Sequence, residues 1–181
     1  MPNVPSTSKD GRIVQVFGNS LHKVSTVVSV PATTDYADND VLSDSASAGT
    51  AWTFSDVVQH EGGTGTIVGA IVICETTDLT QGTMLFLFKA TPTSNLNDNA
   101  ANTAVLWADR ENYIGRLTFA ALSDIGGVSE AQLVSGAGGL PLPFLCAEND
   151  NDIYGILATT DAITGEIAGH DYMIILLIKR D

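Results

Sequence analysis

The chain has 181 residues, a mass of 19.0 kDa and a formal net charge of −13, from 8 Lys and Arg against 21 Asp and Glu. Its hydrophobic fraction of 44% predicts a chain that folds, and its length suits one domain. The acidic excess argues against nucleic acid as a partner, because phosphate binding depends on Lys and Arg. The 15 Asp outnumber the 6 Glu, and Thr, Ser, Asn and Gly are abundant, a composition typical of strands and turns.

The chain shows no pattern for export or membrane insertion. Residues 1–17 lack the apolar centre of a signal peptide, and the longest apolar run, 173–178, is far shorter than the ~18 residues of a spanning helix. We therefore expect no membrane partner and synthesis in a cytoplasm. Cys74 and Cys146 fall in apolar segments, which favours two buried thiols, although a disulfide between them stays open.

The N-terminal segment differs from the rest of the chain. Residues 1–20 are mostly polar and include Pro2 and Pro5, which predicts an extended N-terminal arm. Residues 21–181 contain short segments rich in Val, Ile, Thr and aromatic residues, and such segments predict strands. In chain order, the expected strands cover 12–17, 23–30, 36–43, 51–58, 66–75, 84–89, 114–122, 132–134, 140–146, 153–160 and 172–179.

Turn signals separate these segments. Glycines gather at 62–65 and 136–139, a long polar loop covers 94–103, and 100–110 predicts one or two helical turns. The run 66–75 is almost continuously apolar, which suits a strand buried on both faces or lying deep in a sandwich. Strand spacings of about 8–20 residues without helical periodicity indicate a sandwich or barrel. We therefore predict an all-β fold, an antiparallel, jelly-roll-like β-sandwich over 21–181, preceded by the arm.

Residues that could support catalysis do not form a recognisable pattern. The sequence contains neither G-x-S-x-G nor H-E-x-x-H. His22, His60 and His170 lie on separate segments without a second ligand at metal-site spacing. The acidic clusters at 35–44 and 148–152 offer calcium ligands but do not match an EF-hand loop. We expect no catalytic residue, no metal site and no cofactor, and therefore no enzyme.

The charge is unevenly distributed along the chain. Residues 1–23 carry a net charge of +2 and residues 179–181 carry +1, whereas residues 24–178 carry −16. Basic ends on an acidic body suggest that the ends meet a different environment from the outer surface. The candidate partner-binding residues are Lys9, Arg12 and Lys23. The alternative is that the arm is simply a polar segment.

Several segments, taken in order, match a pattern of structural proteins. They are 27–30 (VVSV), 36–41 (YADNDV), 52–58 (WTFSDVV), 62–67 (GGTGTI), 85–88 (LFLF), 91–93 (TPT), 98–99 (DN), 115–119 (GRLTF), 142–144 (LPF) and 153–157 (IYGIL). With these segments the chain resembles the decoration or cement proteins of tailed-phage capsids, which are jelly-roll-like sandwiches on the outside of the head. The resemblance spans residues 24–178 and leaves the basic arm outside.

The resemblance implies a structural role without catalytic residues. It implies the major capsid protein as partner, a homotrimer at local three-fold positions, and a place on the capsid surface of a virion assembled in the host cytoplasm. Two other classes stay open. One is a carbohydrate-binding or tail-fibre module, with Trp52 or Trp107 stacking on sugars. The other is a sandwich-fold hydrolase or lyase, which needs acids or His converging in one cleft.

Overall fold

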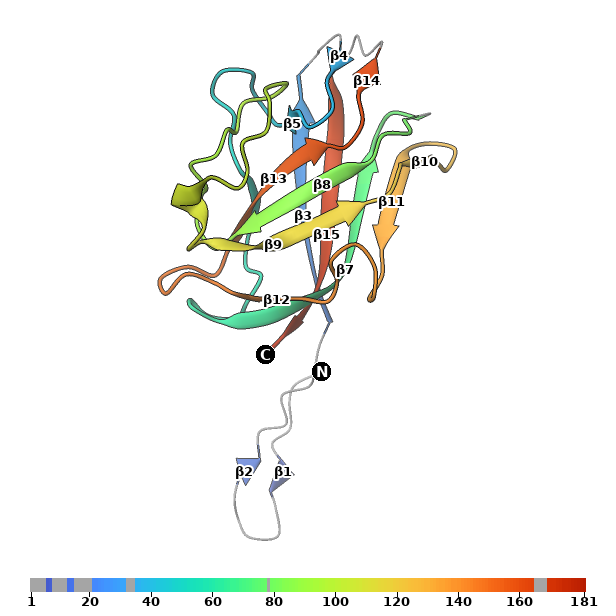
Figure 1. Ribbon diagram of the computed structural model, residues 1–181. Helices are drawn as coiled ribbons and strands as arrows, with labels where there is room; N and C mark the ends of the chain where they lie inside the picture. Colours follow the sequence, from blue (N-terminus) through green and yellow to red (C-terminus); the bar gives the residue numbers. More distant parts are fainter. Residues whose placement is uncertain (1–5, 8–12, 15–20, 32–34, 78, 165–168) are drawn as a thin grey trace.

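The computed structural model describes residues 6–7, 13–14, 21–31, 35–77, 79–164 and 169–181 (Figure 1). Within these residues the regular structure is strands, apart from one 3-10 turn, η1 (Trp107–Asp109). Of the predicted arm, the structure describes β1 (Ser6–Thr7) and β2 (Ile13–Val14), which pair antiparallel. The division between arm and body at residue 20 therefore stays a prediction.

Two antiparallel sheets make the sandwich. The six-stranded sheet contains β3 (Leu21–Val30), β7 (Thr64–Cys74), β10 (Ser123–Asp124), β11 (Ser129–Leu133), β12 (Leu142–Leu145) and β15 (His170–Arg180). The five-stranded sheet contains β5 (Val41–Leu42), β6 (Trp52–Phe54), β8 (Thr83–Phe88), β9 (Tyr113–Phe119) and β13 (Ile153–Thr159). At one end, β4 (Asp35–Tyr36) pairs with β14 (Ile163–Thr164).

The pairing order identifies the topology. β3 pairs with β15, β5 and β6 pair with β13, β7 pairs with β11 and β12, and β8 pairs with β9. The first half of the sandwich thus pairs with the second half in reverse order, like one long hairpin wrapped around the core. This arrangement of two sheets is a jelly roll. The predicted all-β, antiparallel, jelly-roll-like sandwich is confirmed.

The core lies between the two sheets. Its largest fully buried side chains include Trp52, Phe54 and Tyr172. Alternate residues of each strand point inward, as the pleat requires. In β7 this alternation decides between the two alternatives for the run 66–75. Ile71 and Ile73 are only partly buried, so the alternative of burial on both faces is wrong.

Three predicted elements differ from the observed ones. The expected strand 36–43 is interrupted, because Asp40 accepts a 2.7 Å hydrogen bond from the backbone N–H of Ala37 and closes a turn. The expected strand 51–58 ends at Phe54, since Asp56 has a φ of 56° and its N–H donates to Asp152 over 2.8 Å. The expected helix in 100–110 is limited to η1. Side-chain hydrogen bonds to the backbone interrupt the two strands.

The polar loop after β8 crosses the outer face of the five-stranded sheet. Leu96, Ala104 and Val105 from this loop pack on a second apolar cluster, made of Val41, Phe86, Phe88, Ile156 and Ala158. Buried Asp98 fixes the loop, since it accepts hydrogen bonds from the Tyr36 hydroxyl (2.9 Å) and the Ser43 N–H (3.0 Å). The outer face of this sheet is therefore covered by the chain itself.

Candidate functional site

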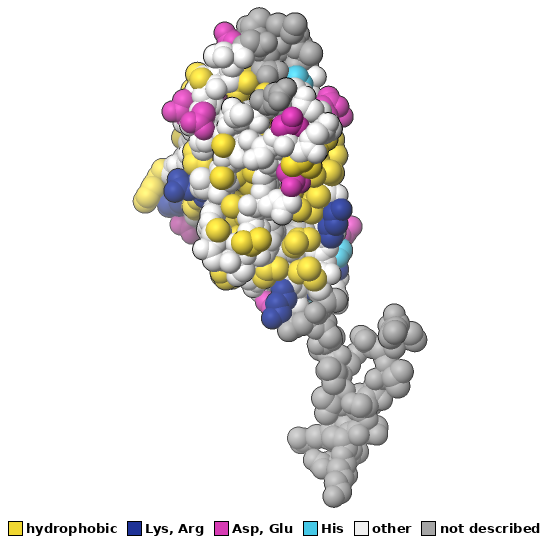
Figure 2. Space-filling model, turned by 90° about the vertical axis from the view of Figure 1, so that its right-hand side faces the viewer, with side chains coloured by type: hydrophobic (Ala, Val, Ile, Leu, Met, Phe, Trp, Pro, Cys, Tyr) yellow, Lys and Arg dark blue, Asp and Glu magenta, His cyan; other side chains and the backbone are white. Residues whose placement is uncertain are grey.

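The basic residues predicted to bind a partner are not all described. Lys9 and Arg12 lie outside the described residues. Lys23 is exposed on β3, opposite Leu177 in the sheet. On the face shown in Figure 2, Asp and Glu lie mostly towards the upper end, and Lys and Arg lie in the middle and towards the lower end, where β3 begins. The partner-binding role of the three residues stays a prediction.

The two tryptophans occupy opposite environments. Trp52 is 1% exposed and its indole N–H donates to the Leu42 carbonyl over 2.9 Å. It is a core residue, so the expectation that it stacks on a sugar is wrong. Trp107 is 80% exposed on η1. Of the two tryptophans, only Trp107 has an exposed ring that could contact a partner.

Trp107 belongs to a compact protruding group, residues 106–110, which we term the Trp107 tip. The Arg110 guanidinium carbon lies 4.4 Å from the centre of the Trp107 ring, a cation–π contact, and the same guanidinium donates to the Trp107 carbonyl over 2.7 Å. Leu106 beside it is 40% exposed. The tip therefore presents an apolar and a cationic side chain in one fixed arrangement.

Asp109 anchors the Trp107 tip to the loop before it. Its carboxylate is buried and accepts four hydrogen bonds, from the N–H groups of Thr93 (2.8 Å) and Ser94 (2.9 Å) and from both hydroxyls (2.7 Å each). Burial by itself raises the pKa of Asp109, but the hydrogen bonds from Ser94 and Thr93 outweigh burial and leave the pKa below its ordinary value. The carboxylate is thus charged at neutral pH, and its bonds hold the tip rigid.

Sequence reasoning missed this anchor and the one at Asp98. Asp98 lies in the polar loop 94–103, which predicts a solvated segment, and Asp109 lies in 100–110, which predicts helical turns. Asp98 accepts hydrogen bonds from Ser43, which lies 55 positions earlier in the chain, and from Tyr36, which lies 62 positions earlier. No local pattern reports contacts over such distances in the sequence.

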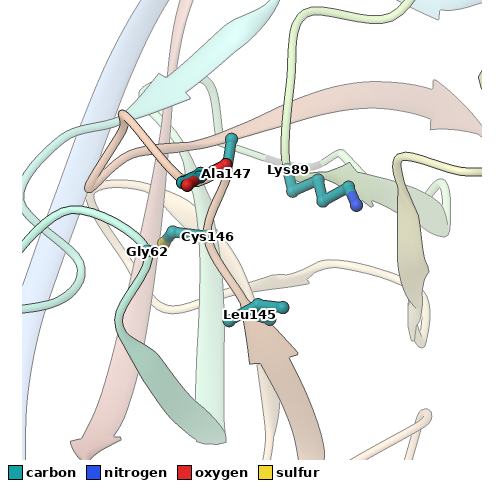
Figure 3. A pocket seen from close by; sticks show the side chains of 6 residues that line it. Gly62, Lys89, Leu145, Cys146 and Ala147 are labelled. Carbon is teal, nitrogen blue, oxygen red and sulfur yellow. The ribbon is translucent and has the colours of Figure 1, made fainter.

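A surface pocket of about 350 Å³ opens beside β12 (Figure 3) and is lined by Gly62, Lys89, Leu145, Cys146, Ala147 and Glu148. Burial, with the nearby charges of Asp150 and Asp152, raises the pKa of Cys146 to about 11. Its thiol is therefore protonated at neutral pH and is a weak nucleophile. Cys74 and Cys146 are both buried and outside any disulfide, as predicted.

The acidic clusters serve local structure. Asp44 accepts hydrogen bonds from the N–H (2.7 Å) and hydroxyl (2.8 Å) of Thr50, and Asp150 accepts one from the Tyr154 hydroxyl (2.8 Å). Among the described residues, no group of three or more His, Cys, Asp or Glu is placed to hold a metal ion. In the same part of the chain, no helix has the length and apolar character to span a membrane.

No family model and no curated protein matches the chain. Solved structures with some likeness come from Desmodium yellow mottle tymovirus (10% identity, 96% of this chain and 97% of that chain, TM-score 0.26) and black queen cell virus (9%, 99% and 80%, TM-score 0.29). Another is the T13 viral particle of IBDV (8%, 99% and 44%, TM-score 0.24). Likenesses with such low TM-scores carry no weight for function.

Proposed function

We propose that this chain is a non-catalytic structural protein of a virus particle. In this proposal it binds the outer surface of a tailed-phage capsid and bridges neighbouring copies of the major capsid protein. Binding across subunits adds its free energy to the stability of the shell, because the protein binds the assembled shell and not its separated parts. The observation that carries the proposal is the Trp107 tip.

The tip has the composition of a protein-binding anchor. Trp and Arg are enriched among the interface residues that contribute most to binding. The buried carboxylate of Asp109 ties the backbone of the tip to Ser94, and the cation–π contact holds Arg110 against Trp107 before binding. Less side-chain entropy is therefore lost on docking. The jelly roll, a fold of viral capsid domains and lectins, provides the rigid frame.

Location in a particle tests this proposal. Virions are purified from the host that makes this chain, and electron cryomicroscopy together with the ratio of the chain to the major capsid subunit locates it. We expect density on the outer surface between capsid subunits. Absence from purified particles, or a place inside the shell, would contradict the proposal.

The tip is tested separately by binding to heads that lack the protein. We expect Trp107→Ala to lower occupancy at least tenfold, in line with the roughly 2 kcal/mol or more of an anchor residue. Ile125→Ala removes another exposed apolar side chain, at 58% exposure in the turn beside β10, and serves as the matched control. Equal occupancy for both variants would exclude the tip as the docking site.

The arm and the assembly state complete the proposal. Lys9, Arg12 and Lys23 supply the basic end that meets an acidic patch of the capsid, and deletion of residues 1–20 should reduce occupancy. Unchanged binding of the truncated chain would remove the arm from the proposal.

The assembly state belongs to the same proposal. A homotrimer follows from the three-fold positions of a shell, and cryomicroscopy of the decorated head reports it directly.

One observation favours a second function, carbohydrate binding. The open side of Trp107, at 80% exposure of the residue, offers an aromatic platform of the kind on which sugar rings stack. A glycan array separates the two functions. Binding to a glycan that Trp107→Ala abolishes would favour the adhesion module. Binding to capsid heads, with no binding to any glycan on the array, would favour the capsid protein.

A further inference from the structure

The outer face of the six-stranded sheet carries a continuous apolar surface. We term it the β15 face, and its aliphatic residues are Val27, Ile71, Ile73, Met173, Ile175 and Leu177. Along β15, Tyr172, Ile174 and Leu176 point into the core, so the residues between them point outward. The sheet register places Val27 and Ile73 on either side of Met173, and Ile71 beside Ile175. The aliphatic residues therefore lie side by side on three neighbouring strands.

This surface is not part of the core of the sandwich. Ile175 is 6% exposed yet belongs to neither core cluster, and Val27 at its edge is 57% exposed. In Figure 1, β3, β15 and β7 run behind the five-stranded sheet. The outer face of that other sheet is covered by the loop with Leu96 and Val105. Within the described residues, no helix or strand packs across the β15 face in the same way.

The charges around the β15 face are ordered along the strand. Asp171 and Lys179 are both exposed, and they lie four residues before and four residues after Ile175. Glu130 lies beside Ile73 at the acidic end, and Lys23 lies beside Leu177 at the basic end. Within the described part of the chain, neither Lys23 nor Lys179 forms an ion pair.

We propose that this chain pairs with a second copy of itself through the β15 face. The two-fold axis passes over Ile175, perpendicular to the strands, so the two sheets pack with their strands antiparallel. Asp171 of one copy then meets Lys179 of the other, and Met173 meets Leu177, each twice. Such an interface is isologous, since the same surface serves both copies. The charge order favours this arrangement, because parallel strands would place like charges together.

The face has adequate size for such a pair. With β11, which places Glu130 at the rim beside Ile73, the face is four strands wide. Four strands about 4.8 Å apart and nine residues of about 3.4 Å each span about 19 Å by 30 Å, or roughly 600 Å² of flat area. Side-chain relief raises the accessible area above that value, towards the roughly 800 Å² per partner of a standard interface. Apolar residues surrounded by charged ones reproduce the usual layout of interfaces. The inference depends only on this face and is separate from the proposed place in a virion.

Solution mass with matched variants tests the pairing. For the full-length wild-type chain, light scattering after size exclusion should give twice the 19.0 kDa of one chain. If the proposed homotrimer also forms in solution through another surface, pairing through the β15 face should give a hexamer, six times the mass of one chain. Met173→Glu places a carboxylate in the apolar centre and should halve the mass. Circular dichroism and thermal unfolding of the same samples verify that the variant is folded.

A charge exchange tests the orientation. Asp171→Lys and Lys179→Asp each turn two attractive contacts into two repulsive ones, and each should weaken the pair about tenfold or more in dissociation constant. The double exchange, Asp171→Lys with Lys179→Asp, restores opposite charges and should restore the mass. Asp38→Lys, at an exposed turn position away from this face, is the control and should have no effect. A monomeric wild type, a mass insensitive to Met173→Glu, or failure of the double exchange to rescue would each overturn the proposed pair.

Discussion

The carboxylate of Asp109 accepts hydrogen bonds from both donors of Ser94, the backbone N–H at 2.9 Å and the hydroxyl at 2.7 Å. Ser94 is 3% exposed, so neither donor finds water when the carboxylate is removed. We expect Asp109→Ala to lower the free energy of unfolding by about 2–4 kcal/mol, the cost of stranding buried donors. Urea unfolding measures the change. Asp38→Ala, an exposed Asp in a turn, is the control; an equal loss in both variants would contradict the anchoring role.

Acid should weaken the fold through the same carboxylate. The pKa values of Asp109 and Asp44 lie below the ordinary value, because hydrogen bonds to each carboxylate outweigh the effect of burial. A carboxylate with a lowered folded pKa stabilises the fold fully above its unfolded pKa of about 3.9 and loses that contribution as pH falls through the folded pKa. We therefore expect these two groups to add no pH dependence above about pH 5 and to reduce stability progressively below pH 4.

The acid prediction is checked by urea unfolding at a series of pH values. The variant Asp109→Asn loses the ionisable group and should show a shallower fall in stability below pH 4 than the wild type. Identical slopes for the two proteins would show that Asp109 does not contribute to acid sensitivity.

The two tryptophans should respond in opposite ways to truncation. Trp52→Ala removes a ring that is 1% exposed and should cost about 3–5 kcal/mol of stability. Trp107→Ala removes a ring that is 80% exposed and should change stability by less than about 0.5 kcal/mol. Thermal unfolding measures both effects. A large loss for Trp107→Ala would mean that the Trp107 tip is structural and does not serve binding.

The thiols should be inert in the native protein. Burial raises the pKa of Cys146 to about 11, so little of its thiolate exists at pH 8. Cys74 is fully buried, so reagents do not reach it. Titration with a disulfide reagent such as DTNB should show no rapid reaction in buffer and two reactive thiols in urea. Rapid labelling of native Cys146 would instead mark the pocket beside β12 as an open, reactive site.

The strands were predictable from sequence because their signal is local. Trp52 and Phe54 alternate with polar residues and point inward, as their spacing predicts. The run 66–75 predicts a strand, but periodicity alone does not assign Ile71 and Ile73 to the outer face, since a continuous apolar run carries no alternation.

The roles of polar residues were harder to predict. Nothing in the local sequence of Asp98 or Asp109 distinguishes it from an exposed carboxylate. Their burial depends on donors elsewhere in the chain, Tyr36 and Ser43 for Asp98 and Ser94 for Asp109. The exposure of Trp107 follows from the same anchoring. Such roles depend on tertiary contacts, which composition and spacing do not encode.

The pairing of β3 with β15 also constrains how the protein folds. The Ser29 hydroxyl donates to Asp171 across 142 residues of sequence, while β15 lies between β3 and β7 in the finished sheet. During translation, β3 and β7 emerge long before the strand that joins them and expose unpaired edges in the meantime. Folding that depends on distant contacts is slow. The strand that completes the six-stranded sheet is thus among the last to be made, and the nascent chain is most exposed to aggregation until β15 joins β3 and β7.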